Sequence, residues 1–448
     1  MMGDTPYNIG STEQLSKIIY SKEIIDKKNW NITFGLGTDE EGIKRIPPKY
    51  PANTFRDLVE AKTRPVQYTI GTKCNVCKGV GAYRKIKKDK TPFLNITKCK
   101  DCSGHGVILT ASSRIAGFNI PIKTQLDINA NGGVVGEAKL QYIADKNPGR
   151  AREFLLDLIR YRQVTKYLST FVEGMKSHVY ENNILHPKFS QTNVVTGRLS
   201  CSDPNFQNIP RGDKLPIKRV IQSRFEGGSI IEMDFAQLEF RVAAFLSQDK
   251  QSVYDITHGV DVHQNTADVI GCSRQDAKAH TFKPLYGGFS GTAEEKTYYA
   301  WFKKRYKGIV AWQTSTEDTA IATKLVTLPS GRQYYFENIM RDVKGGSNYF
   351  TQVRNYPVQG FATGDIVPVA CIDVHNALKH LKTRLINTVH DSVIIDAHPE
   401  EVTNVLELLT KTCGNIVESI NKRYNINFNV PLDFEIKMGS NWLDLKQI

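Results

Sequence analysis

The stretch "INTVHDSVIIDAHP", residues 386–399, interrupts an apolar β-branched run with three polar side chains. Val389 and residues 393–395 are typical of a buried strand, and His390, Asp391 and Ser392 stand between them. An ionised carboxylate that is buried without a partner is costly, so such a group is either paired or bound to a metal ion. A hairpin with an Asp in its turn is the simpler interpretation, and the rest of the chain must decide between the two.

A second carboxylate has a similar setting in "GGSIIEMDFAQLEFRVAAFLSQD", residues 227–249, where Asp234 follows an apolar run. The pattern predicts a strand that leads into a helix. If the two strand ends are neighbours, Asp234 and Asp391 can hold two Mg²⁺ ions, because hard cations prefer oxygen ligands. The backbone carbonyl of Phe235 offers a further oxygen. Two metal ions held in this way stabilise the attacking and departing oxygens in phosphoryl transfer.

A basic and aromatic pattern follows in "RQDAKAHTFKPLYGG", residues 274–288. Arg274, Lys278, Phe282 and Tyr286 recur every four residues and would share one face of a helix. Such a face suits a triphosphate at its cationic end and a base or sugar at its aromatic end. A solvated amphipathic helix is the alternative. Pro284 predicts a kink or helix end near residue 283, which would displace Tyr286.

Two copies of the pattern Cys-x-x-Cys-x-Gly-x-Gly stand at residues 74–81 and 99–106. Glycines allow backbone amides to approach the sulfurs, and four thiolates suit one structural Zn²⁺ in tetrahedral geometry. The predicted ligands are Cys74, Cys77, Cys99 and Cys102. The remaining four cysteines are scattered and are interpreted as reduced thiols. The loop between the two copies is basic and either faces solvent or contacts phosphates.

Composition and charge limit the functional classes. The chain has 448 residues, of which 40% are hydrophobic, and its formal net charge is +13. This length predicts two to four domains, and the charge favours a polyanionic partner, nucleic acid before an anionic membrane. No apolar run approaches the ~20 residues that a membrane span needs. The first residues lack the features of a signal peptide, so a cytoplasmic protein is expected.

Together these motifs resemble those of the family A DNA polymerases, the group of bacterial DNA polymerase I and several phage replicases. "DFAQLEFR" resembles the first palm motif, the Arg-x3-Lys-x3-Phe-x3-Tyr-Gly spacing resembles the fingers helix, and "VHDSV" resembles the second palm motif. The resemblance extends to "TGRLSCSDPNFQNIP" (196–210), "DVHQNTADV" (261–269), "RNYPVQGFATGD" (354–365) and "YNIGSTEQLSKIIY" near the start. The cysteine pattern is similar to the zinc knuckles of DnaJ-type chaperones, from which only the metal is carried over.

The resemblance implies a role for each matching residue. It makes Asp234 and Asp391 the ligands of two catalytic Mg²⁺ ions and Lys278 a proton donor to departing pyrophosphate. Glu239 would exclude a ribose 2′-hydroxyl. The implied nucleotide-binding residues are Arg274, Lys278, Phe282, Tyr286, His263, Glu239 and Gln237. The implied contacts to primer and template DNA are Arg198, Asn205, Gln207, Asn208, Asn355, Gln359 and His390.

The implied fold class is α/β (α+β), a right-hand polymerase with an antiparallel-sheet palm, helical fingers and a helical thumb that carries the zinc-knuckle insertion. Its predicted parts are a thumb region (1–180, zinc knuckle 74–106), a first palm part (181–250), fingers (251–350) and a second palm part (351–448). One departure is Ser392, where the family usually has Glu. Another is the zinc segment itself, which lies where the thumb is expected.

The implied activity is template-directed addition of deoxynucleotides to a primer end, with primer–template DNA and dNTPs as partners. A phage origin, and no 3′–5′ exonuclease in this chain, are expected. A separate exonuclease, a helicase-primase or a processivity factor are conceivable further partners, and no membrane is expected. Two alternatives are a single-subunit RNA polymerase, against which Glu239 argues, and a catalytically inactive zinc DNA-binding clamp. The presence of both aspartates with Arg274 and Lys278 opposes the clamp.

Overall fold

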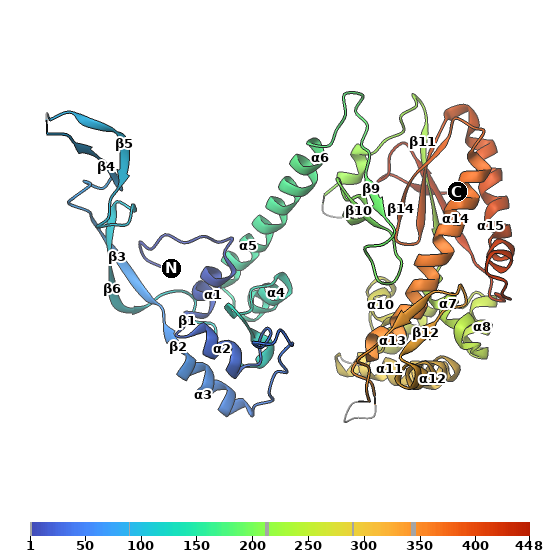
Figure 1. Ribbon diagram of the computed structural model, residues 1–448, viewed down its shortest axis with the longest axis horizontal. Coiled ribbons are helices and arrows are strands. Elements are labelled where there is room, and N and C mark those ends of the chain that lie inside the picture. The colour runs from blue at the N-terminus through green and yellow to red at the C-terminus, as the bar shows by residue number, and fades with distance from the viewer. Residues whose placement is uncertain (1, 89, 211–214, 289–290, 342–345) are drawn as a thin grey trace. The chain divides into compact units, whose positions relative to one another are not determined.

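The computed structural model describes residues 2–88, 90–210, 215–288, 291–341 and 346–448. Contacts within the chain divide it into two compact units, Met1–Lys166 and Tyr167–Ile448, and each is described by itself (Figure 1). The thumb, palm and fingers ranges expected from the sequence stay predictions. The ranges for palm and fingers include residues 211–214, 289–290 and 342–345, which lie outside the described residues.

Unit 1 contains a helical body with its own apolar core. Ser11 caps the first helix by accepting a hydrogen bond from the Gln14 amide, and Leu15, Ile18 and Ile19 of that helix are fully buried. The capped N-terminus and the single buried apolar face both stabilise this short helix. The helices of unit 1 are α1 (Thr12–Tyr20), α2 (Lys27–Thr33), α3 (Ala52–Lys62), α4 (Glu137–Lys146) and α5 (Arg150–Tyr167).

Residues 150–176 form one helical stretch, which consists of α5, a π-helical turn η2 (Leu168–Glu173) and α6 (Gly174–Lys176). Its apolar face is buried only in the first half. Leu155 and Leu158 are buried, whereas Tyr161 and Val164 are 53% and 52% exposed. The helical periodicity alone predicts the helix, but it does not fix how much of the face is covered.

A two-stranded ribbon leaves the helical body of unit 1 (Figure 1). β3 (Gln67–Lys73) pairs with β6 (Val107–Ile115), and beyond them β4 (Ala82–Ile86) pairs with β5 (Pro92–Lys98). We call residues 67–115 the knuckle arm, because the two cysteine motifs join these strand pairs. The shorter strands of unit 1 are β1 (Lys22–Ile24), β2 (Thr63–Pro65), β7 (Ile128–Asn129) and β8 (Gly132–Gly133).

Unit 2 is built on an antiparallel sheet of five strands in the order β14-β15-β11-β16-β17. The opening stretch of the sequence forms the hairpin β14–β15, and the run before Asp234 forms β11, which lies at the centre of the sheet. The strands are β11 (Ser229–Phe235), β14 (Arg384–Val389), β15 (Ser392–Ala397), β16 (Phe434–Gly439) and β17 (Lys446–Gln447).

The two faces of this sheet differ because side chains alternate along each strand. Ile231 and Ile395 face the helices α14 (Val367–Leu378) and α15 (Val402–Tyr424), with which they form one apolar cluster. Ile230 and Ile394 face the other way and pack with Trp442. Asp234 is four residues after Ile230 and therefore lies on the face opposite to the helices.

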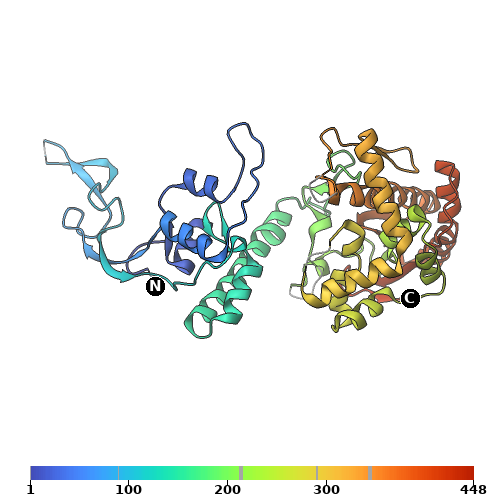
Figure 2. The same ribbon diagram turned by 90° about the horizontal axis from the view of Figure 1, so that it is seen from below.

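The remaining helices of unit 2 share a large core of apolar and aromatic side chains. They are α7 (Leu238–Ser247), α8 (Lys250–Thr257), α9 (Val262–Ile270), α10 (Arg274–Thr281), α11 (Ala293–Arg305), α12 (Lys307–Thr323) and α13 (Phe350–Gln359). Figure 2 shows α11 and α12, coloured gold, in front of the sheet in the view from below. A short hairpin is formed by β12 (Leu325–Thr327) and β13 (Gln333–Tyr335). No helix in the described ranges has the length and apolar character to cross a bilayer.

Candidate active site and candidate metal centre

The two predicted catalytic carboxylates lie at neighbouring positions in the sheet. Val389 pairs with Ser392, so His390 and Asp391 form a two-residue turn between β14 and β15. His390 has a φ of 58°, the left-handed conformation that such a turn requires. Asp234 pairs directly with Ser392, and the Phe235 amide donates a hydrogen bond of 3.3 Å to the Asp391 carbonyl. The fold therefore brings together two acidic residues that are far apart in the sequence.

Electrostatics around Asp234 favour a bound cation. Burial first, and then the negative charges of Asp391 and Glu232, raise the pKa of the Asp234 carboxyl to about 7, although Lys437 acts in the opposite direction. A divalent cation beside Asp234 and Asp391 would offset both the lost hydration and the repulsion. The donor set of these residues thus fits Mg²⁺.

Glu239, in the first turn of α7, lies close to three other predicted site residues. Burial raises the pKa of its carboxyl; the positive charge of Arg198 lowers it, Asp391 raises it, and a hydrogen bond with Gln359 lowers it. These interactions place Arg198, Gln359 and Asp391 around Glu239. Gln237 precedes this helix as its N-cap residue, with a φ of 56°. The Glu239 carboxylate thus lies near Arg198, Gln359 and Asp391, which come from three separate segments of the chain.

The predicted triphosphate-binding residues come from two adjacent helices. Arg274 and Lys278 are exposed on α10, and Arg274 Nε lies 2.6 Å from an Asp261 carboxylate oxygen. His263, on α9, is buried, and its Nδ1 lies 3.0 Å from Thr281 Oγ1. Burial, together with the positive charges of Arg274 and Lys278, lowers the pKa of His263. The neutral form of the His263 imidazole is therefore favoured, and the nearby cations Arg274 and Lys278 are both exposed.

Pro284 ends the helix as predicted, slightly earlier than expected. α10 stops at Thr281, and Lys283–Tyr286 form a separate 3-10 turn, η5, with Pro284 in its first positions. The ring of Phe282 stacks on Phe240 with centroids 5.7 Å apart and an interplanar angle of 25°. The Tyr286 hydroxyl is buried and has no hydrogen-bond partner among the described residues. The turn, rather than a continuous helix, sets the position of Tyr286.

A cavity of about 300 Å³ gathers most of the residues that were expected to contact DNA. Gln207 anchors one wall, since its Nε2 donates a hydrogen bond of 3.2 Å to the Thr388 carbonyl next to the β14–β15 turn. Asn205 accepts a hydrogen bond from the Gln207 amide at 3.0 Å. Of the predicted DNA contacts, the cavity is lined by Arg198, Asn205, Gln207, Asn208 and His390.

Two predicted DNA contacts do not line this cavity. Asn355 and Gln359 are both on α13, and each is half-buried. The Asn355 Oδ1 atom is buried without a hydrogen-bond partner in the described part of the chain. Gln359 instead bonds to Glu239, as described above.

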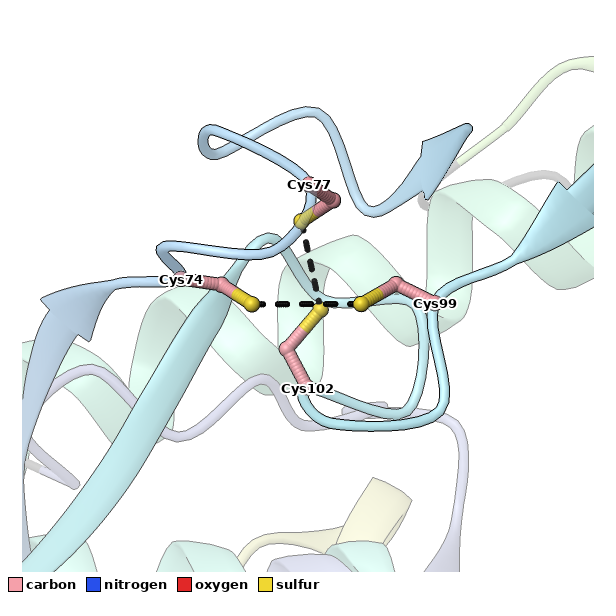
Figure 3. A group of neighbouring side chains, drawn as sticks. All are labelled: Cys74, Cys77, Cys99 and Cys102. Carbon is pink, nitrogen blue, oxygen red and sulfur yellow. Dashed lines mark hydrogen bonds between the residues drawn. The ribbon is translucent and has the colours of Figure 1, made fainter. Parts of the chain in front are cut away.

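The four predicted zinc ligands converge in the knuckle arm, where their sulfurs point toward one another (Figure 3). Their ligand atoms all lie within 4.8 Å of one another, with Sγ–Sγ distances of 3.8 Å for Cys74 and Cys99 and 3.6 Å for Cys77 and Cys102. A tetrahedral Zn²⁺ with bonds of about 2.3 Å requires sulfur–sulfur distances of roughly 3.8 Å. The donor set thus fits zinc in both chemistry and spacing.

Backbone amides stabilise the sulfurs in a repeated pattern. Gly81 N donates to Cys77 Sγ and Gly106 N donates to Cys102 Sγ, both at 3.2 Å. Burial raises the pKa of the Cys77 thiol, but the Gly81 hydrogen bond and those with neighbouring cysteines lower it to about 7. Gly81 and Gly106 have φ values of +80° and +76°, so the glycines serve the backbone conformation predicted for them.

β16 carries an acidic residue next to Asp234 that is not among the site residues predicted from the sequence. Glu435 pairs directly with Asp234, on the side of β11 opposite to Ser392. The alternation Glu-x-Lys in "DFEIKMG", residues 433–439, indicates a strand with charged residues on one face. The register that puts Glu435 beside Asp234 follows only from the folded sheet.

Comparisons with known proteins point to one protein family. The family model for "DNA polymerase family A" matches residues 123–444. The chain is 31% identical over 314 residues to DNA polymerase I of Caldicellulosiruptor bescii and 30% identical over 333 residues to that of Bacillus subtilis. These matches cover 64% and 68% of this chain and 36% of each relative, so the chain spans about a third of their length.

A solved structure shows a similar fold. The POL domain of Pol1 from M. smegmatis, in complex with DNA primer-template and dNTP, matches with a TM-score of 0.59 and 26% sequence identity, covering 70% of this chain and 57% of that one. It supports a mixed helix and sheet polymerase domain. The family match extends over most of the chain and includes both carboxylates and the basic helix α10. The chain therefore belongs to DNA polymerase family A.

Proposed function

We propose that this chain extends the 3′ end of a primer on a DNA template, taking deoxynucleoside triphosphates as substrates. The observation that carries the proposal is the pairing of Asp234 with Ser392, the residue that follows Asp391, in a family A chain. The similar POL domain of M. smegmatis was solved with DNA primer-template and dNTP, and we assign the same partners to this chain. In this proposal β11 and β14–β16 belong to the palm, α9–α12 to the fingers and unit 1 to the thumb.

The two aspartates hold the metal ions in this mechanism. Family A polymerases use divalent metals, and two Mg²⁺ ions supply charge stabilisation for the attacking 3′ oxygen and the departing pyrophosphate. Asp234 and Asp391, with the Phe235 carbonyl, provide their ligands. The raised pKa of Asp234 in the metal-free chain means that binding of the cation releases a proton near neutral pH.

The cationic end of α10 binds the triphosphate. Arg274 exchanges its exposed ion pair with Asp261 for the phosphates, and exposed pairs of this kind are worth about 1 kcal/mol or less. Lys278 lies one turn further along the same face and protonates the departing pyrophosphate. Neutral His263 donates a hydrogen bond to a phosphate oxygen, while Phe282 and Tyr286 line the nucleotide pocket.

The cavity lined by Arg198, Asn205 and Gln207 receives the minor groove of the primer–template duplex. The groove edges of all base pairs present acceptors at similar places, so amide donors sense pair shape without reading sequence. In this proposal the knuckle arm also binds the duplex. It carries ten basic and two acidic side chains between residues 67 and 115, a balance that suits phosphate contacts.

Replacing Glu239 with alanine tests both the activity and the choice of sugar. The parent protein with Mg²⁺ and a primer–template is expected to extend with dNTPs and to reject NTPs. Glu239→Ala should increase ribonucleotide incorporation at least about tenfold relative to dNTP incorporation, because it removes the side chain that occupies the space of a 2′-hydroxyl. The ratio of kcat/KM values for dATP and ATP in single-nucleotide extension measures the effect.

Glu337→Ala is the matched control, because Glu337 is exposed and has no proposed role. It should leave the ratio unchanged. A parent protein that prefers NTPs would favour the RNA polymerase alternative, and one that extends with neither substrate would contradict the proposed activity.

A further inference from the structure

Asp234 is flanked on one face of the sheet by two different neighbours. Ser392 of β15 pairs with it on one side, and Glu435 of β16 pairs with it on the other. Directly paired side chains on antiparallel strands have Cβ atoms about 4.5–5.5 Å apart. Ser392 is buried, and its hydroxyl donates a hydrogen bond of 3.0 Å to the Val389 carbonyl of the same hairpin. The charged neighbour of Asp234 across the ladder is therefore Glu435.

Two carboxylates opposite each other in a sheet repel, which costs stability. A lysine from the same strand partly offsets this cost. Lys437 Nζ lies 2.9 Å from Glu435 Oε2, and its pKa is raised by that hydrogen bond first and also by the charges of Asp234 and Glu232. An ammonium group thus lies among three carboxylates, which marks this part of the sheet face as favourable for a cation.

Glu435 is also free to change partner. Its side chain is 49% exposed and that of Lys437 is 34% exposed, so the ion pair between them is a weak surface pair. A divalent cation next to Asp234 attracts the Glu435 carboxylate more strongly than a partly hydrated ammonium does, because its charge is double.

We propose that Glu435 supplies the third carboxylate of the Mg²⁺ site, through a metal-bound water or directly, with Lys437 holding the side chain until the cation binds. This inference rests on the proposed function for the identity of the site. Glu435 is then a positioning residue that raises the affinity for metal from the β16 side of Asp234, where the residue after Asp391 carries no charge. Carboxylates outside the primary ligands commonly contribute 10- to 100-fold to metal affinity.

The test compares Glu435→Gln with the parent in two assays. The first assay measures Mn²⁺ binding to the protein alone through the loss of the free-ion EPR signal. Glu435→Gln should need about tenfold more Mn²⁺ than the parent for half-saturation. The Mg²⁺ concentration for half-maximal primer extension should rise by a similar factor. The melting temperature should be equal or higher, because the variant removes a like-charge pair across the ladder. A merely structural role for Glu435 would lower the melting temperature instead.

Two further variants decide between position and charge. Glu232→Gln removes the same charge from the same face of the sheet, two residues before Asp234 on β11. It should change the metal requirement less than about threefold. Ser392→Glu, added to Glu435→Gln, places a carboxylate on the other side of Asp234 and should restore the metal requirement to within about threefold of the parent. Equal effects of Glu232→Gln and Glu435→Gln, or no effect of Glu435→Gln, would overturn the inference.

The two assays also separate this inference from the proposed function. If the parent fails to extend primers, the proposed function is wrong. Mn²⁺ binding still tests whether Glu435 raises the affinity for metal. If extension depends on Asp391 but not on Glu435 at any Mg²⁺ concentration, the proposed function stands and the role of Glu435 is wrong.

Discussion

Asp391→Asn is expected to slow primer extension by at least about a thousandfold, which corresponds to about 4 kcal/mol of lost transition-state stabilisation. The change keeps the size of the side chain and a hydrogen-bonding oxygen, but it removes the charge that holds the metal ions beside Asp234. Asp234→Asn should cause a loss of the same order, because both carboxylates serve one site. Single-turnover extension of a labelled primer measures the rates.

The loss must occur without loss of fold or DNA binding. Binding of the primer–template, measured by fluorescence anisotropy, should stay within about threefold of the parent for both variants. Asp373→Asn on α14 makes the same chemical change away from the site and should extend primers normally. Extension by Asp391→Asn at the parent rate would refute the catalytic assignment and favour an inactive DNA-binding protein.

Loss of zinc should unfold the knuckle arm, which is the second large effect expected. The apolar cluster there consists of the four cysteines with Tyr83 packed against them, and isolated two-stranded hairpins are marginally stable at best. Structural zinc sites contribute about 10–16 kcal/mol in small peptides. Cys99→Ser should therefore reduce bound zinc from about one ion per chain to nearly none, and limited proteolysis should then cut within residues 67–115.

The core of unit 2 shares no residue with this cluster, so single-nucleotide extension should survive the substitution. The number of nucleotides added per binding event should fall severalfold, because the basic arm no longer holds the duplex. Cys272→Ser, which changes a partly exposed thiol in unit 2, is the control. Zinc loss with an unchanged protease pattern would show that the arm folds without metal. Unchanged processivity would show that the arm does not contribute to DNA binding.

Local sequence signals predicted the segments of both units that carry the candidate sites. The β-branched runs around Asp234 and Asp391 form β11 and β15, because such side chains suit a pleated, buried surface. The doubled cysteine motif predicted the four converging sulfurs, since it contains all the ligands within 33 residues of chain at 74–106. Pro284 predicted the helix end, because proline lacks the amide that a helix interior needs.

Features that depend on long-range register could not be predicted in the same way. Glu435 lies beside Asp234 only because β16 pairs with β11, and a shift of one residue would turn it to the other face. The exposure of Tyr161 and Val164 shows a similar limit, since the periodicity of α5 is the same along its length while its burial is not. The ion pair of Arg274 with Asp261 depends on how α9 packs against α10.

The two cysteine motifs make matching contacts with each other. Cys74 N donates to the Gly106 carbonyl and Cys99 N donates to the Gly81 carbonyl, each at 2.9 Å. A methyl group at Gly81 would meet the Gly104 carbonyl oxygen at 2.3 Å, and one at Gly106 would meet the Gly79 carbonyl oxygen at the same distance. A side chain at either glycine would therefore displace the backbone of the other knuckle.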